Sequence, residues 1–404
     1  MVKSDKTIIL FTINYPYNTL EHSFLKDELK FLSKNFKSVY LVPQSITGHL
    51  NNFSEDIKIE KSLSVSLQSP TFSQKIRSIC SIEFIKEGFK LKFDRKKIRI
   101  TIATRLSAVV TSDWLIDLLK GKDKSEIVLY SFWFNFSTLA FLKLKTKNIK
   151  IVSRCHNFDL YGNEQNYFYI PFQKKTLEAL DIIYPDSQMG EDYLQSNFPK
   201  ANSTVHLMGV APSPIDNKSS VDGVFRVASC AYVIPRKRVH LLLEGLMVYA
   251  EKHPNHKVHW THIGEGPEWE QLIEKSKKSP PNLDFNFVGN MTNEELHIFY
   301  QKNPVDLFVN TSTKEGTPVS ILEAISYGIP ILATAFGGNK EVVNKGAGIL
   351  LNADPTAEEI ALKISKLIET GEILTYRSKS KLVWSNYYNS NINYQKFCEN
   401  LATL

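Results

Sequence analysis

Short apolar runs alternate with amphipathic stretches along most of the chain. In the first half, apolar runs at 7–13, 38–42, 127–130 and 149–153 predict strands, and a stretch at about 20–32 predicts a helix. The runs are apolar at consecutive rather than alternate positions, which is typical of strands with both faces covered. We therefore predict a parallel sheet with helices on both sides.

The second half of the chain shows the same alternation. Strands are predicted at 225–229, 257–263, 284–288, 307–310 and 331–334, with helices that begin near 237, 267 and 293. The intervening residues 211–222 are rich in Pro, Ser and Asp and predict an interdomain linker. The fold class is thus α/β, with two doubly wound (Rossmann-like) domains at 1–210 and 223–379 that face a central cleft, where such sheets bind ligands.

Residues 315–328 combine a loop and a helix with candidate chemistry. Pro318 suits a first helical turn, and the free amides that follow are typical of a diphosphate site. Glu323, in the second turn, is placed to accept hydrogen bonds from a ribose diol, and Glu315 is placed to face a sugar. The alternative is a capped amphipathic helix with incidental glutamates. The Gly, Pro and Ser residues of the segment and the trailing Gly337–Gly338 favour the ligand site.

This segment resembles the pattern EGxPxSxxEAxxxGxPxxAT, then GGxxE, of the retaining, nucleotide-sugar-dependent glycosyltransferases of family 4, which have the GT-B fold. Segments 262–267 and 287–296 resemble the family's glycine turn beside the base and the segment that packs against the base. The resemblance covers about 226–348. It implies a nucleotide-sugar donor and no other cofactor, with Glu315 catalytic. The implied donor-binding residues are Lys237, Arg236, Gly264, Gly266, Asn290, Gly316, Thr317, Pro318, Val319, Ser320 and Glu323.

The family's basic pair for the diphosphate is only partly matched. Lys237 aligns with the family lysine, but Tyr232 stands where the family has arginine, so Arg236 or Arg238 is expected to supply the second charge. The chain contains no D-x-D motif, and the sequence therefore indicates no metal ion. Lys237 and the helix N-terminus are expected to stabilise the leaving diphosphate instead.

The N-terminal half carries two weaker signals. Residues 154–161 resemble the R-x-H-x-x-D-x-Y segment of a subgroup that acts on bacterial cell-surface polysaccharides. The resemblance implies that His156 approaches the donor sugar, with Asp159 orienting it or meeting the acceptor; a structural role for His156 stays open. Residues 15–24 resemble the subgroup's opening loop without the Gly-Gly turn of the wider family, and Glu21 is a candidate for either acceptor binding or capping. The resemblance also implies that a last helix, about 380–404, packs back on the N-terminal domain; an ordinary last helix of the second domain is the alternative.

The net charge of the chain is concentrated in one segment. Lys plus Arg exceeds Asp plus Glu by 49 to 42, and residues 71–105 alone hold ten basic and three acidic residues, which accounts for the whole +7. Apolar residues, Phe93 among them, interleave with these cations in a roughly helical pattern. This indicates either a surface that lies on an anionic membrane or a solvated helix pair that covers the N-terminal sheet. No nucleic-acid-binding motif accompanies the charge.

The remaining features indicate a compartment. Four widely spaced cysteines are expected to be small buried hydrophobes of a reducing compartment, and the apolar run at 8–13 is too short for a signal peptide. We expect a cytoplasmic protein, peripheral on the inner face of the cell membrane. The predicted function is transfer of a hexose from a UDP-sugar, or a GDP-sugar, to a glycan or lipid-linked acceptor in surface polysaccharide synthesis. The alternatives are a nucleotide-sugar epimerase of the same fold and an inactive glycan-binding relative.

Overall fold

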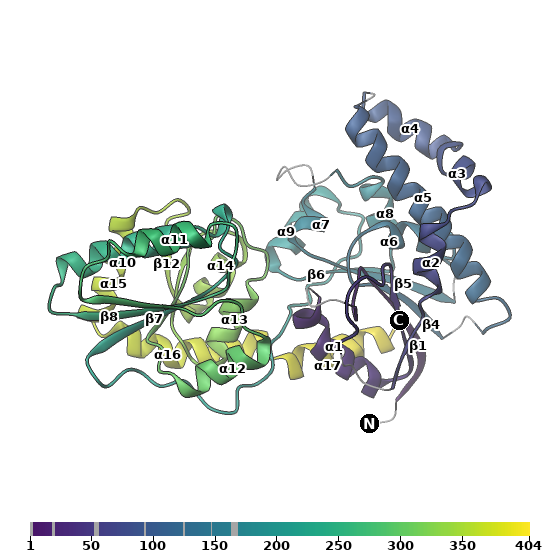
Figure 1. Cartoon of the computed structure of the whole chain (residues 1–404). Coiled ribbons are helices and arrows are strands. Elements are labelled where there is room, and N and C mark those ends of the chain that lie inside the picture. The colour runs from purple at the N-terminus through teal and green to yellow at the C-terminus, as the bar shows by residue number, and fades with distance from the viewer. Residues whose placement is uncertain are drawn as a thin grey trace. The chain divides into compact units, whose positions relative to one another are not determined.

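The computed structural model describes residues 3–17, 21–51, 56–92, 94–123, 126–146, 148–162 and 169–404. Leu20, at the predicted start of the first helix, and Phe93 lie outside these ranges. The chain divides into two compact units (Figure 1). The N-terminal unit comprises residues 1–208 and 392–404, and the C-terminal unit comprises residues 209–391.

The N-terminal unit is built on a parallel sheet with the strand order β3-β2-β1-β4-β5-β6. Its strands are β1 (Ser4–Thr12), β2 (Phe36–Pro43), β3 (Ile57–Ile59), β4 (Ile127–Ser131), β5 (Ile149–Cys155) and β6 (Ile182–Pro185). Its helices are α1 (His22–Asn35), α2 (Ser62–Gln68), α3 (Phe72–Ile79), α4 (Ile82–Lys90), α5 (Arg95–Leu118), α6 (Phe136–Phe141), α7 (Asn157–Leu160), α8 (Gln173–Ala179) and α9 (Gln188–Asn197), joined by α17 (Ser390–Ala402) from the end of the chain.

Strand β1 shows why the predicted runs are uninterrupted. Its side chains alternate between two buried cores, one containing Ile9 and Phe11 and the other Ile8 and Leu10. Because successive residues of a strand point to opposite faces, a sheet covered on both sides needs an apolar residue at every position. The predicted α/β class with doubly wound sheets is confirmed.

Helix α17 packs into the N-terminal unit. Phe397 lies in the same core as Ile8, and its ring centroid lies 4.4 Å from the guanidinium carbon of Arg154. Arg154 is fully buried, and its Nη2 lies 2.8 Å from Glu28 Oε2. Arg154, the first residue of the predicted 154–161 motif, therefore belongs to the core of this unit.

The C-terminal unit contains a second parallel sheet, with the strand order β12-β11-β10-β7-β8-β9. Its strands are β7 (Val224–Cys230), β8 (Lys257–Ile263), β9 (Leu283–Phe287), β10 (Leu307–Asn310), β11 (Ile331–Thr334) and β12 (Gly348–Leu351). Its helices are α10 (Val239–Lys252), α11 (Trp269–Ser276), α12 (Asn293–Lys302), α13 (Val319–Ser326), α14 (Gly337–Val342), α15 (Ala357–Glu369) and α16 (Glu372–Val383), with short helical turns at Pro235–Lys237, Val343–Ala347 and Trp384–Tyr388. None of the helices in the described ranges of the chain is both long and apolar enough to cross a membrane.

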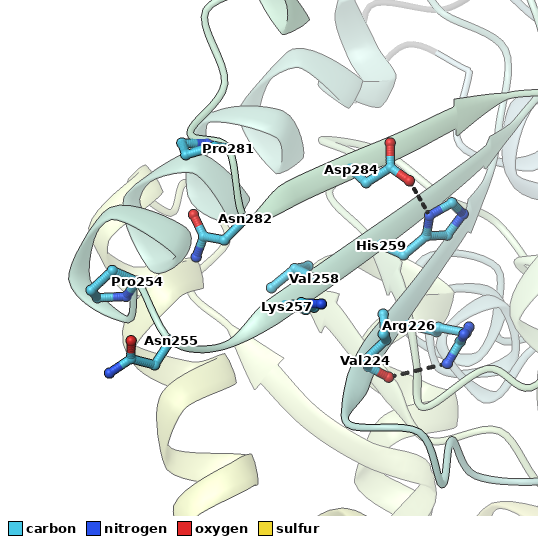
Figure 2. A pocket seen from close by; sticks show the side chains of 10 residues that line it. All are labelled: Val224, Arg226, Pro254, Asn255, Lys257, Val258, His259, Pro281, Asn282 and Asp284. Carbon is cyan, nitrogen blue, oxygen red and sulfur yellow. Dashed lines mark hydrogen bonds and ion pairs between the residues drawn. The ribbon is translucent and has the colours of Figure 1, made fainter.

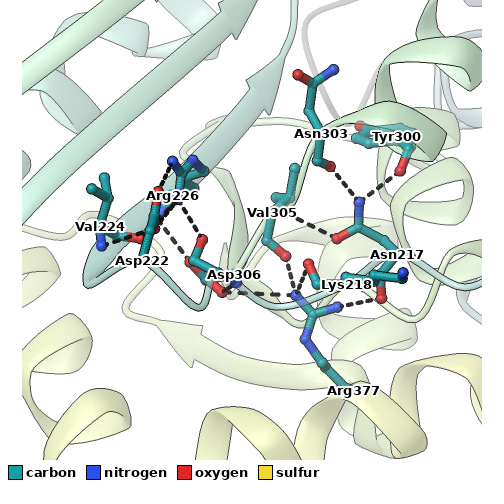
Figure 3. A network of polar contacts seen from close by, with 11 residues as sticks. Asn217, Lys218, Asp222, Val224, Arg226, Tyr300, Asn303, Val305, Asp306 and Arg377 are labelled. Atoms are coloured by element: carbon teal, nitrogen blue, oxygen red, sulfur yellow. Dashed lines mark hydrogen bonds and ion pairs between the residues drawn. The ribbon is translucent and has the colours of Figure 1, made fainter.

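The segment predicted as a linker, 211–222, is fastened to the C-terminal unit by the network in Figure 3. The Asn217 side-chain amide donates to the carbonyl oxygens of Tyr300 and Asn303, both at 2.7 Å, and its Oδ1 accepts from the Val305 amide at 2.9 Å. Asn217 is buried, so these partners satisfy polar groups that water does not reach.

Replacing Asn217 with alanine should lower the free energy of unfolding of the C-terminal unit by about 1–3 kcal/mol, because buried backbone groups lose their partners. Urea denaturation followed by circular dichroism measures this change. The neighbouring exposed Lys218 serves as the matched control, and Lys218→Ala should leave the transition in place. Equal midpoints for the two variants would contradict the structural role of Asn217.

Candidate active site

The candidate site lies at the carboxyl ends of β7 and β10. These strands are neighbours, and the chain continues from β7 toward one edge of the sheet and from β10 toward the other. Such a reversal of strand order opens a ligand crevice in doubly wound sheets. The two following loops are hydrogen-bonded together: the Thr313 amide donates to the Arg236 carbonyl oxygen at 2.8 Å, and Thr311 Oγ1 donates to the Lys237 carbonyl oxygen at 3.0 Å.

This loop pair brings together two residues predicted from the sequence, Lys237 and Glu315. Lys237 Nζ lies 2.5 Å from Glu315 Oε1, and only 16% and 12% of the two side chains are exposed. Asn310 Nδ2 also donates to Glu315 Oε1, at 3.3 Å. The carboxylate thus holds the ammonium group in place and uses one of its three donors, which leaves the others available to an anionic ligand.

The two arginines that are candidates for the second positive charge differ in whether their side chains are already engaged. Arg238 has a left-handed backbone (φ 48°), and its guanidinium donates to the Thr311 carbonyl oxygen at 2.8 Å and to Asp354 Oδ1 at 2.7 Å. Arg236 is exposed, and its side chain has no ion pair within the ranges that the structure describes. Arg236 is therefore the available second cation.

The Gly337–Gly338 pair lets the start of α14 approach the backbone of the loop that contains Glu315 and Gly316. A Cβ atom on Gly338 would lie 1.9 Å from the Gly316 carbonyl oxygen, and one on Gly337 would lie 2.1 Å from the Glu315 carbonyl oxygen. Larger residues would displace the loop. On its other side the loop leads into α13, which begins at Val319, one residue later than predicted from Pro318. The Ile321 amide donates to the Pro318 carbonyl oxygen at 2.9 Å, whereas the amides of Val319 and Ser320 have no acceptor within the helix.

Glu323 lies on α13 and is buried. Asn293 of α12 donates from Nδ2 to Glu323 Oε1 at 2.6 Å, and burial raises the pKa of the carboxyl group to about 7. The sequence predicts a helix start near 293 but gives no sign that this amide turns toward α13. Burial disfavours the charged form of this carboxyl group, whereas a ligand that donates hydrogen bonds to Glu323 would favour it.

The predicted glycine turn packs against the loop that leads to Lys237. A Cβ atom on Gly264 would lie 2.2 Å from the Ala231 carbonyl oxygen, and one on Gly266 would lie 2.4 Å from that of Val233. Asn290 Oδ1 accepts from the Glu265 amide at 3.2 Å. Apart from Glu323, which lies in the second turn of α13, the predicted donor-binding residues therefore lie in loops or helix starts at the carboxyl ends of β7, β8, β9 and β10, the same edge of one sheet.

In the N-terminal unit, Asp159 holds the backbone around His156. Asp159 Oδ1 accepts from the His156 amide at 2.5 Å, and Oδ2 accepts from the Phe134 amide at 2.8 Å. Burial raises the pKa of Asp159. The His156 ring lies 4.4 Å from the ring of Trp133 between centroids. Its Nδ1 lies 3.7 Å from Asp159 Oδ2, beyond hydrogen-bond distance, and within the described residues neither imidazole nitrogen has a hydrogen-bond partner. Trp133, which the sequence did not single out, is thus part of this candidate site.

Glu21 stands at the N-cap position of α1, but its side chain makes no capping hydrogen bond to that helix and instead binds the loop after β1. Its carboxylate accepts from the amides of Asn14 and Tyr15, both at 2.7 Å, from the Ile13 amide at 3.1 Å and from Trp133 Nε1 at 2.5 Å. Four donors on one buried carboxylate stabilise the loop after β1. A role in acceptor binding stays a prediction.

The described residues of both units form pockets away from the Lys237 loop. One, of about 710 Å³, is at the amino ends of β7, β8 and β9, where Lys257 and Asp284 contribute to its wall (Figure 2). That is the opposite edge of the sheet from the loops described above. Another, of about 290 Å³, belongs to the N-terminal unit and is lined by Trp133, Phe158 and Asp159 beside α5.

Two doubly wound parallel sheets, the second with paired charges and a helix N-terminus at its point of strand reversal, define a protein of the GT-B fold class. Residues 216–381 match the family described as Glycosyl transferases group 1, and the chain carries a domain of that family. The resemblance found in the sequence is confirmed.

Several curated relatives match parts of the chain, among them the following two. The alpha-monoglucosyldiacylglycerol synthase of Acholeplasma laidlawii is 27% identical over 175 residues, which cover 42% of this chain and 41% of that protein. The O-antigen biosynthesis glycosyltransferase WbnH of Escherichia coli is 32% identical over 129 residues, 31% of this chain and 35% of its own. The chain thus spans about two-fifths of the length of these relatives. A solved structure of Anabaena HepE, in complex with UDP and glucose, covers 99% of this chain and 100% of its own with a TM-score of 0.63 and 16% identity, and shows the same fold.

Proposed function

We propose that the protein is a retaining glycosyltransferase that transfers a hexose from a nucleotide diphosphate sugar to a glycan or lipid-linked acceptor in surface polysaccharide synthesis. The observation that carries the proposal is the Lys237–Glu315 pair beside the N-terminus of α13, at the point of strand reversal. The names of the relatives WbnH and monoglucosyldiacylglycerol synthase support the acceptor classes. UDP is favoured over GDP because HepE, of the same fold, was solved with UDP and glucose.

Each group in the site has a role in this proposal. The departing nucleoside diphosphate accumulates negative charge, which Lys237, Arg236 and the first amides of α13 stabilise without a metal ion. Glu323 binds the ribose diol, and Glu315 acts at the transferred sugar. The loops that contain Gly264, Gly266 and Asn290 border the base.

The N-terminal unit supplies the remaining contacts. His156 approaches the donor sugar, and the pocket beside Trp133, Phe158 and Asp159 receives part of the acceptor. Aromatic walls with one carboxyl group suit a ligand that is partly apolar and partly hydroxylated. A lipid-linked acceptor would place the enzyme on the inner, cytoplasmic face of the cell membrane.

A screen of nucleotides and nucleotide sugars by thermal shift tests the proposal. UDP or a UDP-sugar should raise the melting temperature, since a ligand at 100 times its Kd adds about 2.7 kcal/mol of stability. NMR of the bound sugar nucleotide should then show slow release of UDP and free sugar. A second UDP-sugar formed without acceptor would indicate an epimerase instead, and binding without any turnover would indicate an inactive relative.

A further inference from the structure

Helices α3 and α4 carry an apolar stripe that is exposed in the part of the chain that the structure describes. The stripe consists of large side chains at helical spacing, each between 41% and 78% exposed: Phe72, Ile76 and Ile79 on α3, and Ile82, Ile85 and Phe89 on α4. Residues spaced by three or four positions share one face of a helix. Figure 1 shows both helices beside α5 at the edge of the N-terminal unit.

The polar faces of α3 and α4 are the faces that contact the rest of the N-terminal unit. Gln74 and Arg77 of α3 both donate to the carboxylate of Asp113 on α5. On α4, buried Glu87 accepts from the Phe172 amide at 3.2 Å, and Glu83 pairs with a cation of α5. A surface helix of a globular protein normally buries its apolar stripe and exposes its polar face. In α3 and α4 this arrangement is reversed.

The segment that carries the stripe also carries positive charge that is unpaired among the described residues. The three acidic residues of the segment are engaged, since Glu83 and Glu87 form ion pairs and Asp94 caps α5. Six exposed cations of the segment have no carboxylate partner in the part of the chain that the structure describes: Lys75, Lys86, Lys92, Arg95, Lys96 and Arg99.

We propose that α3 and α4 dock on an anionic lipid bilayer, with the apolar stripe in the acyl boundary and the cations at the lipid phosphates. Exposed Phe and Ile flanked by Lys and Arg are the composition of helices that lie in a membrane interface. A second copy of the chain fits less well, because a twofold contact places the same surface on itself and would oppose two strongly positive faces. This docking surface is separate from the proposed nucleotide site and goes beyond the proposed function.

Co-sedimentation with vesicles tests the proposal. The wild-type protein should bind vesicles of phosphatidylcholine with phosphatidylglycerol at least about tenfold more strongly than phosphatidylcholine alone, and salt should weaken this binding. The variant Phe72→Ser/Ile82→Ser/Phe89→Ser should lose about tenfold or more of the binding. The matched control is Leu362→Ser/Leu374→Ser/Leu382→Ser, which removes similarly exposed apolar residues from the C-terminal unit and should bind as the wild type does.

Cys80 offers a direct probe of insertion. The expectation that all four cysteines are buried is wrong for Cys80, which is exposed between α3 and α4; Cys155 and Cys398 are buried, and Cys230 is partly buried. A polarity-sensitive fluorophore on Cys80 should shift to the blue with anionic vesicles, and a Cys80→Ser protein should give no such signal.

Three results would overturn the proposal: equal binding to neutral vesicles, wild-type binding by the triple serine variant, or a dimer in light scattering that this variant abolishes. The thermal shift with UDP is measured on the same variants, all of which should retain the wild-type response. Loss of the UDP response in the wild type would remove the proposed function and leave the bilayer proposal standing.

Discussion

Replacing Lys237 with methionine should lower the turnover of the best nucleotide sugar by about 10²–10³-fold or more. Methionine keeps much of the side-chain volume but removes the positive charge that Glu315 holds at this position, 2.5 Å away. The leaving diphosphate gains negative charge in the transition state, so a preorganised positive charge stabilises the transition state more than the bound substrate. Removing this charge should therefore lower turnover more than it weakens substrate binding. Release of the nucleoside diphosphate over time measures this effect.

Glu315→Gln and the double variant Lys237→Met/Glu315→Gln separate the effect on catalysis from the effect on stability. Each single variant leaves a mostly buried charge without its partner, which lowers stability, and the double variant should regain part of that stability. Activity should not return with it. Lys381→Met is the matched control, because Lys381 is a partly exposed lysine that contacts Asp216 at 2.8 Å in the same unit. Turnover by Lys237→Met at the rate of the control would remove the assigned role.

Glu323 should make both stability and ligand binding depend on pH. Its pKa is raised from 4.5 to about 7 by burial, so between these values the folded protein holds a proton that the unfolded chain has released. The free energy of unfolding of the ligand-free protein should therefore fall as the pH rises from about 4.5 to 7, by up to about 3 kcal/mol from this group. Chemical denaturation across this range measures the slope. Glu323→Gln should remove this contribution, whereas Glu372→Gln, at an exposed position, should retain it.

Binding of a UDP-sugar should show the opposite trend with pH. Ribose hydroxyls that donate to Glu323 favour its charged form. Binding should therefore be weaker at pH 6 than at pH 8, with a Kd that is several-fold higher. The diphosphate of a UDP-sugar keeps a constant charge over this range, and calorimetry with it therefore isolates the protein group. A Kd that is independent of pH in the wild type would show that Glu323 does not meet the ribose.

Much of the fold was predictable because consecutive apolar residues directly report a strand with two covered faces. The strands that the sequence did not predict, β3, β6 and β12, are all edge strands of their sheets. They are three or four residues long, and three of the four residues of β12 are only partly buried. With one neighbour strand and only three or four residues each, they leave a weak hydrophobic signal, even in β6, where three of the four residues are buried.

The sequence by itself determined which residue types stand at the candidate site, because Glu315, Pro318 and Glu323 lie close together in the chain, on one loop and the helix that follows it. Only the tertiary structure decided which distant groups meet them. Lys237 joins Glu315 across 78 positions, and Asn293 reaches Glu323 across 30. The strand order and loop packing set these contacts. Local periodicity likewise predicts that α3 and α4 are amphipathic, but only their polar contacts with the rest of the N-terminal unit decide which face remains uncovered.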